Sequence, residues 1–423
     1  MTFAESPAVL LRRLFDRAVA VADPMLVIPA ALPPRPAGRV VVVGAGKASA
    51  RMAEAVEAAW GPCDGLVITR YGYARPCQGI EIVEAAHPVP DAAGEAATAR
   101  MLALLEGLGE GDMVLALISG GASALLVAPA GTMTLVEKQG VNAALLASGA
   151  PIDRMNVLRK HLSRVKGGQL AAAAWPAQMV SLMISDVPGD DPAYIGSGPT
   201  VGDASTPQDA RDIVARWSIA LPPSAHAVLD GPTGVVPPGD PRLSKVDNRV
   251  IVAPSQSLAA AAERAAEAGC VVRILGNALE GEAREVATAH AALALGAQAG
   301  LTTGDAPVLL LSGGELTVTR RGDGIGGPNA EYALALAVAL EGAEGIYAIA
   351  CDTDGVDGAA EVAGAIIGPD ILARAPADAI RALAINDSHS FFAASGDQVV
   401  TGPTLTNVND FRAILIFPKD GSQ

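Results

Sequence analysis

Two strand-forming runs in this chain end in the same Ser-Gly-Gly turn, one in each half of the sequence. They are VLALISGGAS, residues 114–123, and VLLLSGGEL, residues 308–316. Two glycines directly after a buried strand let backbone N–H groups approach an anion closely, and a helix that follows adds its positive end. Gly-Gly after a strand is also common turn punctuation. Its recurrence in both halves favours phosphate binding over punctuation.

Strand-like runs alternate with helical runs along most of the chain. Strands are expected at residues 40–43, 65–69, 179–185 and 346–352, and a capping box at Thr134 predicts the start of a helix. This alternation predicts mostly parallel sheets covered by helices on both faces. Half of the residues are hydrophobic but only 3% are aromatic, as is typical of Ala, Val and Leu helices on buried sheets. We expect two three-layer α/β/α domains, the first Rossmann-like, with the active site in a cleft between them.

The length of 423 residues suits two or three domains. The clearest composition break lies at residues 221–241, which contain six prolines and several glycines. Such stretches are typical of domain boundaries. We therefore expect a first domain over residues 1–235 and a second α/β domain over residues 236–423.

The charge balance excludes some classes of partner. Lys and Arg number 30 and Asp and Glu number 45, so the net charge of −15 argues against nucleic acid or an anionic membrane surface. The first twenty residues lack the pattern of a signal peptide. The uncharged stretch 113–136 is interrupted by Ser-Gly-Gly and Pro129, so we interpret it as a buried strand and loop.

Cysteine usage predicts a cytoplasmic protein without a zinc site. No CxxC pair and no neighbouring His cluster accompanies the cysteines, and scattered thiols are typical of a reducing compartment. The four cysteines are Cys63, Cys77, Cys270 and Cys351.

A third glycine turn, VVVVGAGKASARM at residues 40–52, partly resembles a dinucleotide fingerprint. Gly44 and Gly46 fit its first two positions, but Ser49 replaces the third glycine and no acid ends the next strand. A nicotinamide site is therefore weakly supported. Lys47 stands at the start of a helix, where it opposes the helix dipole. It therefore either has an anionic partner or is solvated on the surface.

Basic residues concentrate at RMNVLRKHLSRVK, residues 154–166. At helical spacing Arg159 and Lys166 lie one heptad apart on the same face. Such a concentration can bind the carboxylate or phosphate of a small acidic substrate. The alternative is a solvated basic face that pairs with nearby acids.

Two acidic loops follow predicted strands, where α/β sheets place their ligands. They are SDVPGDDP, with Asp186, Asp190 and Asp191, and CDTDGVDG, with Asp352, Asp354 and Asp357. Carboxylates on tight loops suit Mg²⁺ carried by a nucleotide. The alternative is Asp in its ordinary role in turns.

A glycine-rich stretch, GDGIGGPNAE at residues 322–331, precedes an expected helix. It is consistent with a flexible lid, a phosphate cradle or a plain loop. Ser119 and Ser123 do not indicate a serine hydrolase, because ISGGAS lacks the GxSxG pattern and no histidine is placed to support a triad.

Nine motifs in order resemble the glycerate 2-kinase family, whose members were long labelled hydroxypyruvate reductases of the tartrate pathway. The resemblance runs nearly end to end, and the region from about residue 307 is similar to the MOFRL domain. The motifs are GAGKAS, AAHPVPD, ISGGASALL, LRKHLSRVKGGQLA, SDVPGDDP, SGGE, GGPNAE, DTDGVDG and TGPTLTNVND.

The resemblance implies transfer of the ATP γ-phosphoryl group to the 2-hydroxyl of D-glycerate with Mg²⁺. The family's lysine in the GAGKAS turn corresponds to Lys47. In many relatives GGPNAE reads GGRNQE, so an arginine of theirs is Pro328 here, and Arg320 or Arg321 are the bases that could replace it. Small-molecule substrates are expected, and the oligomeric state, including a homo-oligomer, stays open.

The candidate residues fall into four groups. We expect Lys47 to contact phosphate or substrate, and Asp191, or else Asp186, to accept the hydroxyl proton. Candidates for substrate binding are Ser119, Gly120, Gly121, Ser123, Arg159 and Lys166. Candidates for ATP binding are Gly44, Gly46, Ser312, Gly313, Gly314, Glu315, Gly326, Gly327 and Asn329. Candidates for metal binding are Asp190, Asp352 and Asp354.

Two other functions compete with a kinase. An NAD(P)H-dependent hydroxypyruvate reductase would need the complete dinucleotide pocket that Ser49 interrupts. A non-catalytic binding protein for an acidic metabolite would gain nothing from acidic loops beside its ligand.

Overall fold

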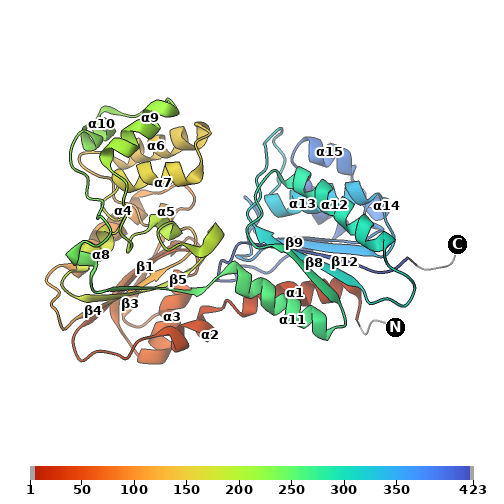
Figure 1. Cartoon of the computed structure of the whole chain (residues 1–423), viewed down its shortest axis with the longest axis horizontal. Helices are drawn as coiled ribbons and strands as arrows, with labels where there is room; N and C mark the ends of the chain where they lie inside the picture. Colours follow the sequence, from red (N-terminus) through yellow and green to blue (C-terminus); the bar gives the residue numbers. More distant parts are fainter. Residues whose placement is uncertain (1–4, 420–423) are drawn as a thin grey trace. The chain divides into compact units, whose positions relative to one another are not determined.

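The structure is a computed structural model that describes residues 5–419 of the chain. It contains two compact units. One is Pro24–Val252, and the other combines the described residues of Met1–Asp23 and Ala253–Gln423. Each unit has a central sheet with helices on both faces (Figure 1), which confirms the expected layering within each unit. Among residues 5–419, no helix has both the length and the apolarity that a bilayer span requires.

The sheet of the 24–252 unit is fully parallel, with strand order β3-β2-β1-β4-β5-β6. Its central strand β1 is buried along its whole length, as expected when helices cover both faces. The chain reverses its direction of travel across the sheet between β1 and β4, and ligands bind at such switch points. The strands are β1 (Val40–Ala45), β2 (Asp64–Arg70), β3 (Ile80–Ala85), β4 (Met113–Ile118), β5 (Gln178–Ile184) and β6 (Val246–Val252).

Helices α2 and α3 cover one face of this sheet, and α4, α5 and α8 cover the other (Figure 1). Four more helices form a separate apolar cluster with Leu145, Leu158 and Ile213 in its core. The helices are α2 (Pro24–Ala31), α3 (Ser49–Trp60), α4 (Ala92–Leu105), α5 (Ala122–Leu125), α6 (Leu135–Ala147), α7 (Ile152–His161), α8 (Gln169–Ala174), α9 (Pro207–Arg216) and α10 (Pro223–Leu229).

The sheet of the second unit is mixed, with strand order β11-β10-β9-β12-β8-β7. Among the described strands of this sheet, only β7 and β8 pair in parallel. β12 inserts antiparallel between β8 and β9, and β10 pairs antiparallel with both β9 and β11. The mostly parallel arrangement expected from the sequence therefore describes the first sheet better than the second. The strands are β7 (Val271–Gly276), β8 (Val308–Gly314), β9 (Ile346–Asp352), β10 (Gly364–Ile367), β11 (Gln398–Val399) and β12 (Asp410–Ile416).

Strand alternation divides the core of the second unit into two layers. In β12, Ile414 faces the layer of α12 and α13, whereas Phe411 and Leu415 face the layer of α1 and α11. The helices are α1 (Pro7–Ala20), α11 (Pro254–Glu267), α12 (Ala283–Ala299), α13 (Pro328–Leu340), α14 (Ile371–Arg374), α15 (Ala379–Ala384) and α16 (Ser388–Ser395).

The division of the chain differs from the boundary expected at residues 235 and 236. The Pro-rich stretch 221–241 lies inside the first unit, because the chain returns afterwards to pair β6 with β5. The first helix belongs to the other unit, where the rings of Phe15 and Phe411 lie 5.9 Å apart. Both differences come from packing between segments that are far apart in the sequence. Local composition does not predict such packing.

Candidate active site

Three of the predicted site segments follow neighbouring strands of the parallel sheet. Ala45 of β1 pairs with Ile118 of β4, and Ile118 pairs with Met183 of β5. The GAGK turn, the first Ser-Gly-Gly turn and the loop 185–191 therefore begin at the same edge of the sheet. This edge lies at the switch point, where α/β sheets bind ligands.

The GAGK turn packs against the Ser-Gly-Gly turn with no space for a side chain at residue 46. A Cβ atom on Gly46 would lie 2.1 Å from Ser119 Oγ. Ser119 is fully buried, and its hydroxyl accepts a hydrogen bond from Ala48 N at 3.0 Å. Ser49 Oγ donates to Leu117 O at 2.9 Å. Ser119 and Ser49 therefore hold the two turns together, and neither hydroxyl faces open space.

Lys47 and the glycines of the Ser-Gly-Gly turn meet at this edge. Lys47 N donates to Gly120 O at 2.8 Å. Gly121 is left-handed with φ 81°, and a Cβ there would lie 3.1 Å from the His87 ring and 3.3 Å from Lys47 Cγ. Neither Gly120 N–H nor Gly121 N–H donates a hydrogen bond within residues 5–419. Two free backbone donors beside a lysine and a histidine can bind an anion.

Lys166 is buried, and its amine contacts carbonyl oxygens. Its Nζ donates to Ser123 O at 2.9 Å and to Gly196 O at 3.3 Å, and burial lowers its pKa well below the usual range. Lys138 is also buried, donates to Leu162 O at 3.1 Å and has its pKa lowered by burial to about 7. Lys166 therefore ties the Ser-Gly-Gly segment to the turn at residues 195–198.

Arg159 is partly buried, and no carboxylate among residues 5–419 forms an ion pair with it. Its Nη1 donates to Asn156 Oδ1 at 3.3 Å, and burial lowers its pKa. Ser123 Oγ lies 3.0 Å from Ser197 Oγ, which donates to the same Asn156 Oδ1 at 3.3 Å. The structure thus brings the predicted residues Ser123, Arg159 and Lys166 into one connected group.

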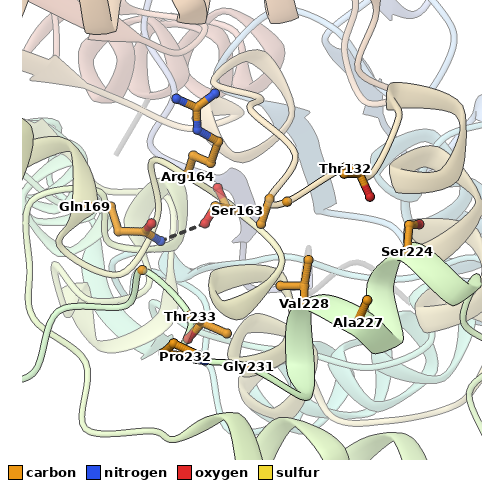
Figure 2. A pocket seen from close by; sticks show the side chains of 13 residues that line it. Thr132, Ser163, Arg164, Gln169, Ser224, Ala227, Val228, Gly231, Pro232 and Thr233 are labelled. Carbon is orange, nitrogen blue, oxygen red and sulfur yellow. Dashed lines mark hydrogen bonds between the residues drawn. The ribbon is translucent and has the colours of Figure 1, made fainter.

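The other basic residues of the segment 154–166 point elsewhere. Lys160 forms a buried ion pair with Asp203, and the exposed Arg154 pairs with Asp153 at 3.3 Å. Arg164 is exposed and lines a separate cavity of about 590 Å³. In Figure 2 its guanidinium extends away from the hydroxyl-bearing Thr132 and Ser224 on the opposite wall. The basic segment therefore serves several purposes, and only part of it belongs to the candidate site.

The loop 185–191 carries three acids in different settings. Asp186 is half-buried, and Asp191 is exposed, with its Oδ1 accepting from Ala193 N at 2.9 Å. Asp190 has a left-handed backbone with φ 56°. Its Oδ1 is buried and accepts no hydrogen bond from residues 5–419. A buried carboxylate oxygen without a donor is the feature that a bound cation would satisfy.

The second Ser-Gly-Gly turn differs from the first, because an arginine from the neighbouring strand fills it. Arg412 Nη2 donates to Gly313 O and Gly314 O, both at 2.9 Å, and Nη1 pairs with Asp410 Oδ2 at 2.8 Å. Gly314 has φ 102°, and a Cβ there would lie 2.1 Å from Leu279 N. Ser312 is buried and Glu315 is exposed. Arg412 therefore satisfies the carbonyl oxygens of this turn, although its own Nε is buried and donates no hydrogen bond within residues 5–419.

The start of α13 is connected to the second Ser-Gly-Gly turn. Asp357 accepts from Asn329 N at 3.0 Å and from Ala330 N at 2.8 Å, so it caps the helix from a distant loop. Its Oδ2 lies 3.0 Å from His389 Nε2, and Asn329 Nδ2 donates to Asp410 Oδ1 at 2.7 Å. Burial raises the pKa of Asp410, and Arg412 opposes that rise. Asn329 is therefore held by protein contacts through its N–H groups, while its buried Oδ1 accepts no hydrogen bond from residues 5–419.

The glycine-rich stretch 322–327 is anchored along its length. Asn386 Oδ1 accepts from Arg321 N at 2.6 Å and Gly322 N at 3.1 Å, and Asp387 Oδ1 accepts from Ile325 N at 2.9 Å. A Cβ on Gly327 would lie 2.4 Å from the carboxyl carbon of Asp357. These contacts disfavour a free lid. Gly326 is half-buried and Gly327 is buried beside them.

Asp352 and Asp354 lie in one tight turn. Asp354 N donates to Asp352 Oδ1 at 2.9 Å, and Val356 N donates to Asp354 Oδ1 at 2.8 Å. Asp354 is fully buried. Within residues 5–419, no group of three or more His, Cys, Asp or Glu side chains is arranged to hold a metal ion.

Sequence reasoning missed Asn156, Ser197 and Arg412, which organise the two turns. Ser197 stands in GSGPT, where glycines flank a serine, and that pattern signals an unusual backbone. Asn156 and Arg412 carry no local signal, because their partners lie on other segments.

Comparisons with known proteins cover both units. A family model described as a domain of unknown function (DUF4147) matches residues 10–230, and the MOFRL family matches residues 308–410. The D-glycerate 2-kinase of Thermotoga maritima is 38% identical, over 89% of this chain and 91% of that protein. A protein of Agrobacterium vitis with the provisional name hydroxypyruvate reductase is 55% identical, over 96% of this chain and 94% of its own length.

Solved structures give the same result. The crystal structure of glycerate kinase from Thermotoga maritima matches with a TM-score of 0.85 at 36% identity, over 97% of this chain and 99% of that one. Both sequence and fold thus correspond nearly end to end. By this correspondence the chain belongs to the glycerate 2-kinase family.

Proposed function

We propose that this protein is a glycerate 2-kinase, which transfers the ATP γ-phosphoryl group to the 2-hydroxyl of D-glycerate and releases ADP and 2-phospho-D-glycerate. One observation carries the proposal. In a chain similar end to end to the Thermotoga maritima glycerate kinase, Lys47, the Ser-Gly-Gly turn and the acidic loop 185–191 begin at one edge of the sheet. Phosphoryl transfer needs such positioned charges more than covalent chemistry.

The carboxylate of glycerate is assigned to Arg159 and Ser123. A partly buried guanidinium without a carboxylate partner costs free energy, and an anionic ligand would offset that cost. Ser123 and the free N–H groups of Gly120 and Gly121 add neutral donors. Ser119 and Lys166 support this group from beneath, because both are buried and bonded to backbone.

Lys47 is assigned to the transferring phosphoryl group. Its charge would stabilise the negative charge that spreads over the phosphoryl oxygens in the transition state. Of the acids in the loop, Asp191 is our first candidate for the acceptor of the hydroxyl proton, and Asp186 is the second. Asp191 is exposed and so can reach a substrate.

Mg²⁺ is assigned to the nucleotide phosphates, with Asp190 as the protein ligand. Its orphaned Oδ1 fits a cation, and Mg²⁺ is ordinarily held by one or two carboxylates together with substrate phosphates. When bound, the ion would neutralise phosphate charge. Asp352 and Asp354 stay candidates, although both already accept backbone hydrogen bonds.

The remaining ATP-binding assignments rest on backbone and shape more than on side chains. Gly44 and Gly46 leave no room for a Cβ beside β4. Ser312 and Asn329 are buried, whereas Glu315 is exposed and can reach a ligand. The remaining candidates of this group are Gly313, Gly314, Gly326 and Gly327.

The test is incubation of the purified protein with D-glycerate, ATP and Mg²⁺. ADP release is followed, and phosphorus NMR identifies the phosphoglycerate isomer. We expect 2-phosphoglycerate. The 3-phosphate would correct the position of transfer, and ADP release without D-glycerate would reveal only ATP hydrolysis.

A parallel assay with NADH and hydroxypyruvate tests the reductase. The buried Ser49 occupies the third position of the dinucleotide fingerprint and bonds to Leu117 O, so it already has a structural role. We expect no NADH oxidation. Turnover of hydroxypyruvate without any kinase activity would replace the proposed function by the reductase.

A further inference from the structure

Ser197 has a backbone conformation that favours glycine. Its φ is 64°, in the left-handed region, and its neighbours Gly196 and Gly198 have φ 58° and 61°. Residues that carry a Cβ atom, apart from Asn and Asp, rarely adopt this conformation, because the Cβ atom crowds the backbone. Ser197 is also 99% buried, with a relative exposure of 1%. A strained residue retained in a buried turn points to a role for its side chain.

The hydroxyl of Ser197 bridges two segments of the candidate site. It lies 3.0 Å from Ser123 Oγ on the Ser-Gly-Gly segment, and it donates to Asn156 Oδ1 on α7 at 3.3 Å. The same Asn156 oxygen accepts from Arg159 Nη1 at 3.3 Å. One amide oxygen therefore connects the strained turn with the guanidinium assigned to the substrate. A glycine at residue 197 would break that connection.

Asn156 orients Arg159 without neutralising it. An amide oxygen accepts a hydrogen bond from a guanidinium, as a carboxylate would, but it carries no net charge. Asn156 is 6% exposed, so the pairing is sheltered from water. An aspartate of the same shape would form an ion pair with Arg159 and leave less charge for a ligand. The neutral partner therefore preserves an anion site.

We propose that Asn156 and Ser197 are positioning residues that aim the Arg159 guanidinium at the carboxylate of the substrate and leave its charge uncompensated. This inference rests on the proposed function, because it takes D-glycerate as the substrate. It predicts that both residues act on KM for glycerate and leave KM for ATP unchanged.

The first test is Ser197→Gly, which relieves the backbone and removes the hydroxyl. We expect KM for D-glycerate to rise on the order of tenfold, while Tm stays comparable to that of the wild type. The matched control is Ser218→Gly, because Ser218 also has a left-handed backbone with φ 49° but is exposed and outside the site. That control should keep the wild-type KM. An unchanged KM in Ser197→Gly would overturn the role of the hydroxyl.

The second test is Asn156→Asp, which keeps the Oδ1 acceptor and the shape of the side chain but replaces the neutral amide by a carboxylate. A merely structural role predicts a wild-type KM, because the hydrogen bonds persist. The positioning role predicts a rise in KM for D-glycerate on the order of tenfold or more, with KM for ATP unchanged. Binding is also measured without turnover, from the shift in Tm that D-glycerate alone produces. Asn156→Asp should weaken that shift.

The outcomes separate the two proposals. If the wild type does not phosphorylate D-glycerate, the proposed function fails and this inference fails with it. If the wild type is active but both variants keep its KM for glycerate, only the positioning role fails. If Arg159→Leu keeps the wild-type KM, the anion site itself is misassigned.

Discussion

The two Ser-Gly-Gly turns have the same sequence and opposite surroundings. The first, at residues 119–121, lies on the segment whose Ser123 is connected to Arg159 and Lys166, and neither cation pairs with a carboxylate within the described chain. The N–H groups of Gly120 and Gly121 make no hydrogen bonds there either. The second, at residues 312–314, is held through its carbonyl groups by Arg412, which pairs with Asp410. The first turn has glycine N–H donors without a partner among the described residues, whereas the carbonyl oxygens of Gly313 and Gly314 in the second turn are bonded to Arg412.

The difference shows that a glycine turn after a strand permits a close approach but does not by itself determine whether the turn binds a ligand. In both turns glycine permits a close approach, to Ser119 in one case and to Leu279 in the other. What the turn then does depends on which charged side chain the neighbouring segments supply. The first turn is connected to Arg159, which has no carboxylate partner among residues 5–419, so we assign the substrate there, and the second holds the sheet of its own unit together.

The largest expected effect is on stability, from Arg412→Met. The guanidinium is 1% exposed and Asp410 is 5% exposed, so removal of the arginine leaves a buried carboxylate without its partner. We expect the free energy of unfolding, measured by urea denaturation, to fall by about 3–5 kcal/mol.

Two further variants sharpen this prediction. Arg412→Met with Asp410→Asn should recover part of the loss, because the charge and its partner are removed together. Arg159→Leu, on α7 near the first turn, should cost little stability, because Arg159 has no carboxylate partner among residues 5–419. If Arg412→Met and Arg159→Leu lowered the free energy of unfolding equally, the proposed difference between the two turns would be wrong.

The next effect is on catalysis, from Lys47→Ala. Loss of one charged group that stabilises the transition state lowers kcat/KM on the order of 100- to 1000-fold. ADP release with D-glycerate measures it. The control is Lys245→Ala, because Lys245 pairs with an exposed Glu110 at 3.5 Å and lies outside the site. If Lys47→Ala and Lys245→Ala had comparable activity, Lys47 would not belong to the active site.

A smaller effect concerns the pH dependence of stability at Lys138. Burial lowers its pKa from 10.5 to about 7, so between these values the unfolded state binds more protons than the folded state. Lys138 therefore destabilises the fold most at or below pH 7, and its contribution to stability improves as the pH rises toward 10.5. Lys138→Met should stabilise the protein more at pH 6.5 than at pH 9.5.

Urea midpoints at the two pH values measure that difference. Lys138→Met also removes the hydrogen bond to Leu162 O, but this loss is the same at both pH values and cancels in their difference. Lys245→Met, at a partly exposed lysine, is the control and should show no such trend. A benefit of Lys138→Met that grows with pH would contradict the lowered pKa.

The smallest effect compares a local helix cap with a distant one. Thr134 caps α6 from the adjacent residue, whereas Asp357 caps α13 from another loop. Thr134→Ala should reduce the free energy of unfolding by about 1 kcal/mol, measured by urea denaturation. Thr132→Ala, at an exposed neighbour, is the control and should change little. If Thr134→Ala lowered the free energy of unfolding as much as Arg412→Met, Thr134 would do more than cap α6.

Much of the first unit follows from local patterns. The capping box at Thr134 predicts the start of α6 at Leu135, and the apolar run at residues 179–185 predicts β5. The GAGK, Ser-Gly-Gly and acidic segments each follow a strand, and parallel strands bring their carboxyl ends to one edge. Lys47 and the first Ser-Gly-Gly turn could therefore be placed together from sequence.

The second unit could not be predicted to the same depth. The antiparallel insertion of β12 (Asp410–Ile416) depends on pairing with β8 (Val308–Gly314) and β9 (Ile346–Asp352), which both lie far from it in the sequence. The position of Arg412 inside the second turn follows from that insertion. A sequence pattern that reports neighbours along the chain has no access to either fact.

The amino-acid sequence alone set the elements, the turns and the residue types of the candidate site, because these depend on neighbours a few residues apart. Tertiary structure alone decided which charges are paired. Arg412 meets Asp410, while the Arg159 guanidinium meets the neutral Asn156 and no carboxylate within residues 5–419. The reason is physical, because the electrostatic environment of a side chain depends on distance in space and on burial, and both are determined only when the whole chain packs.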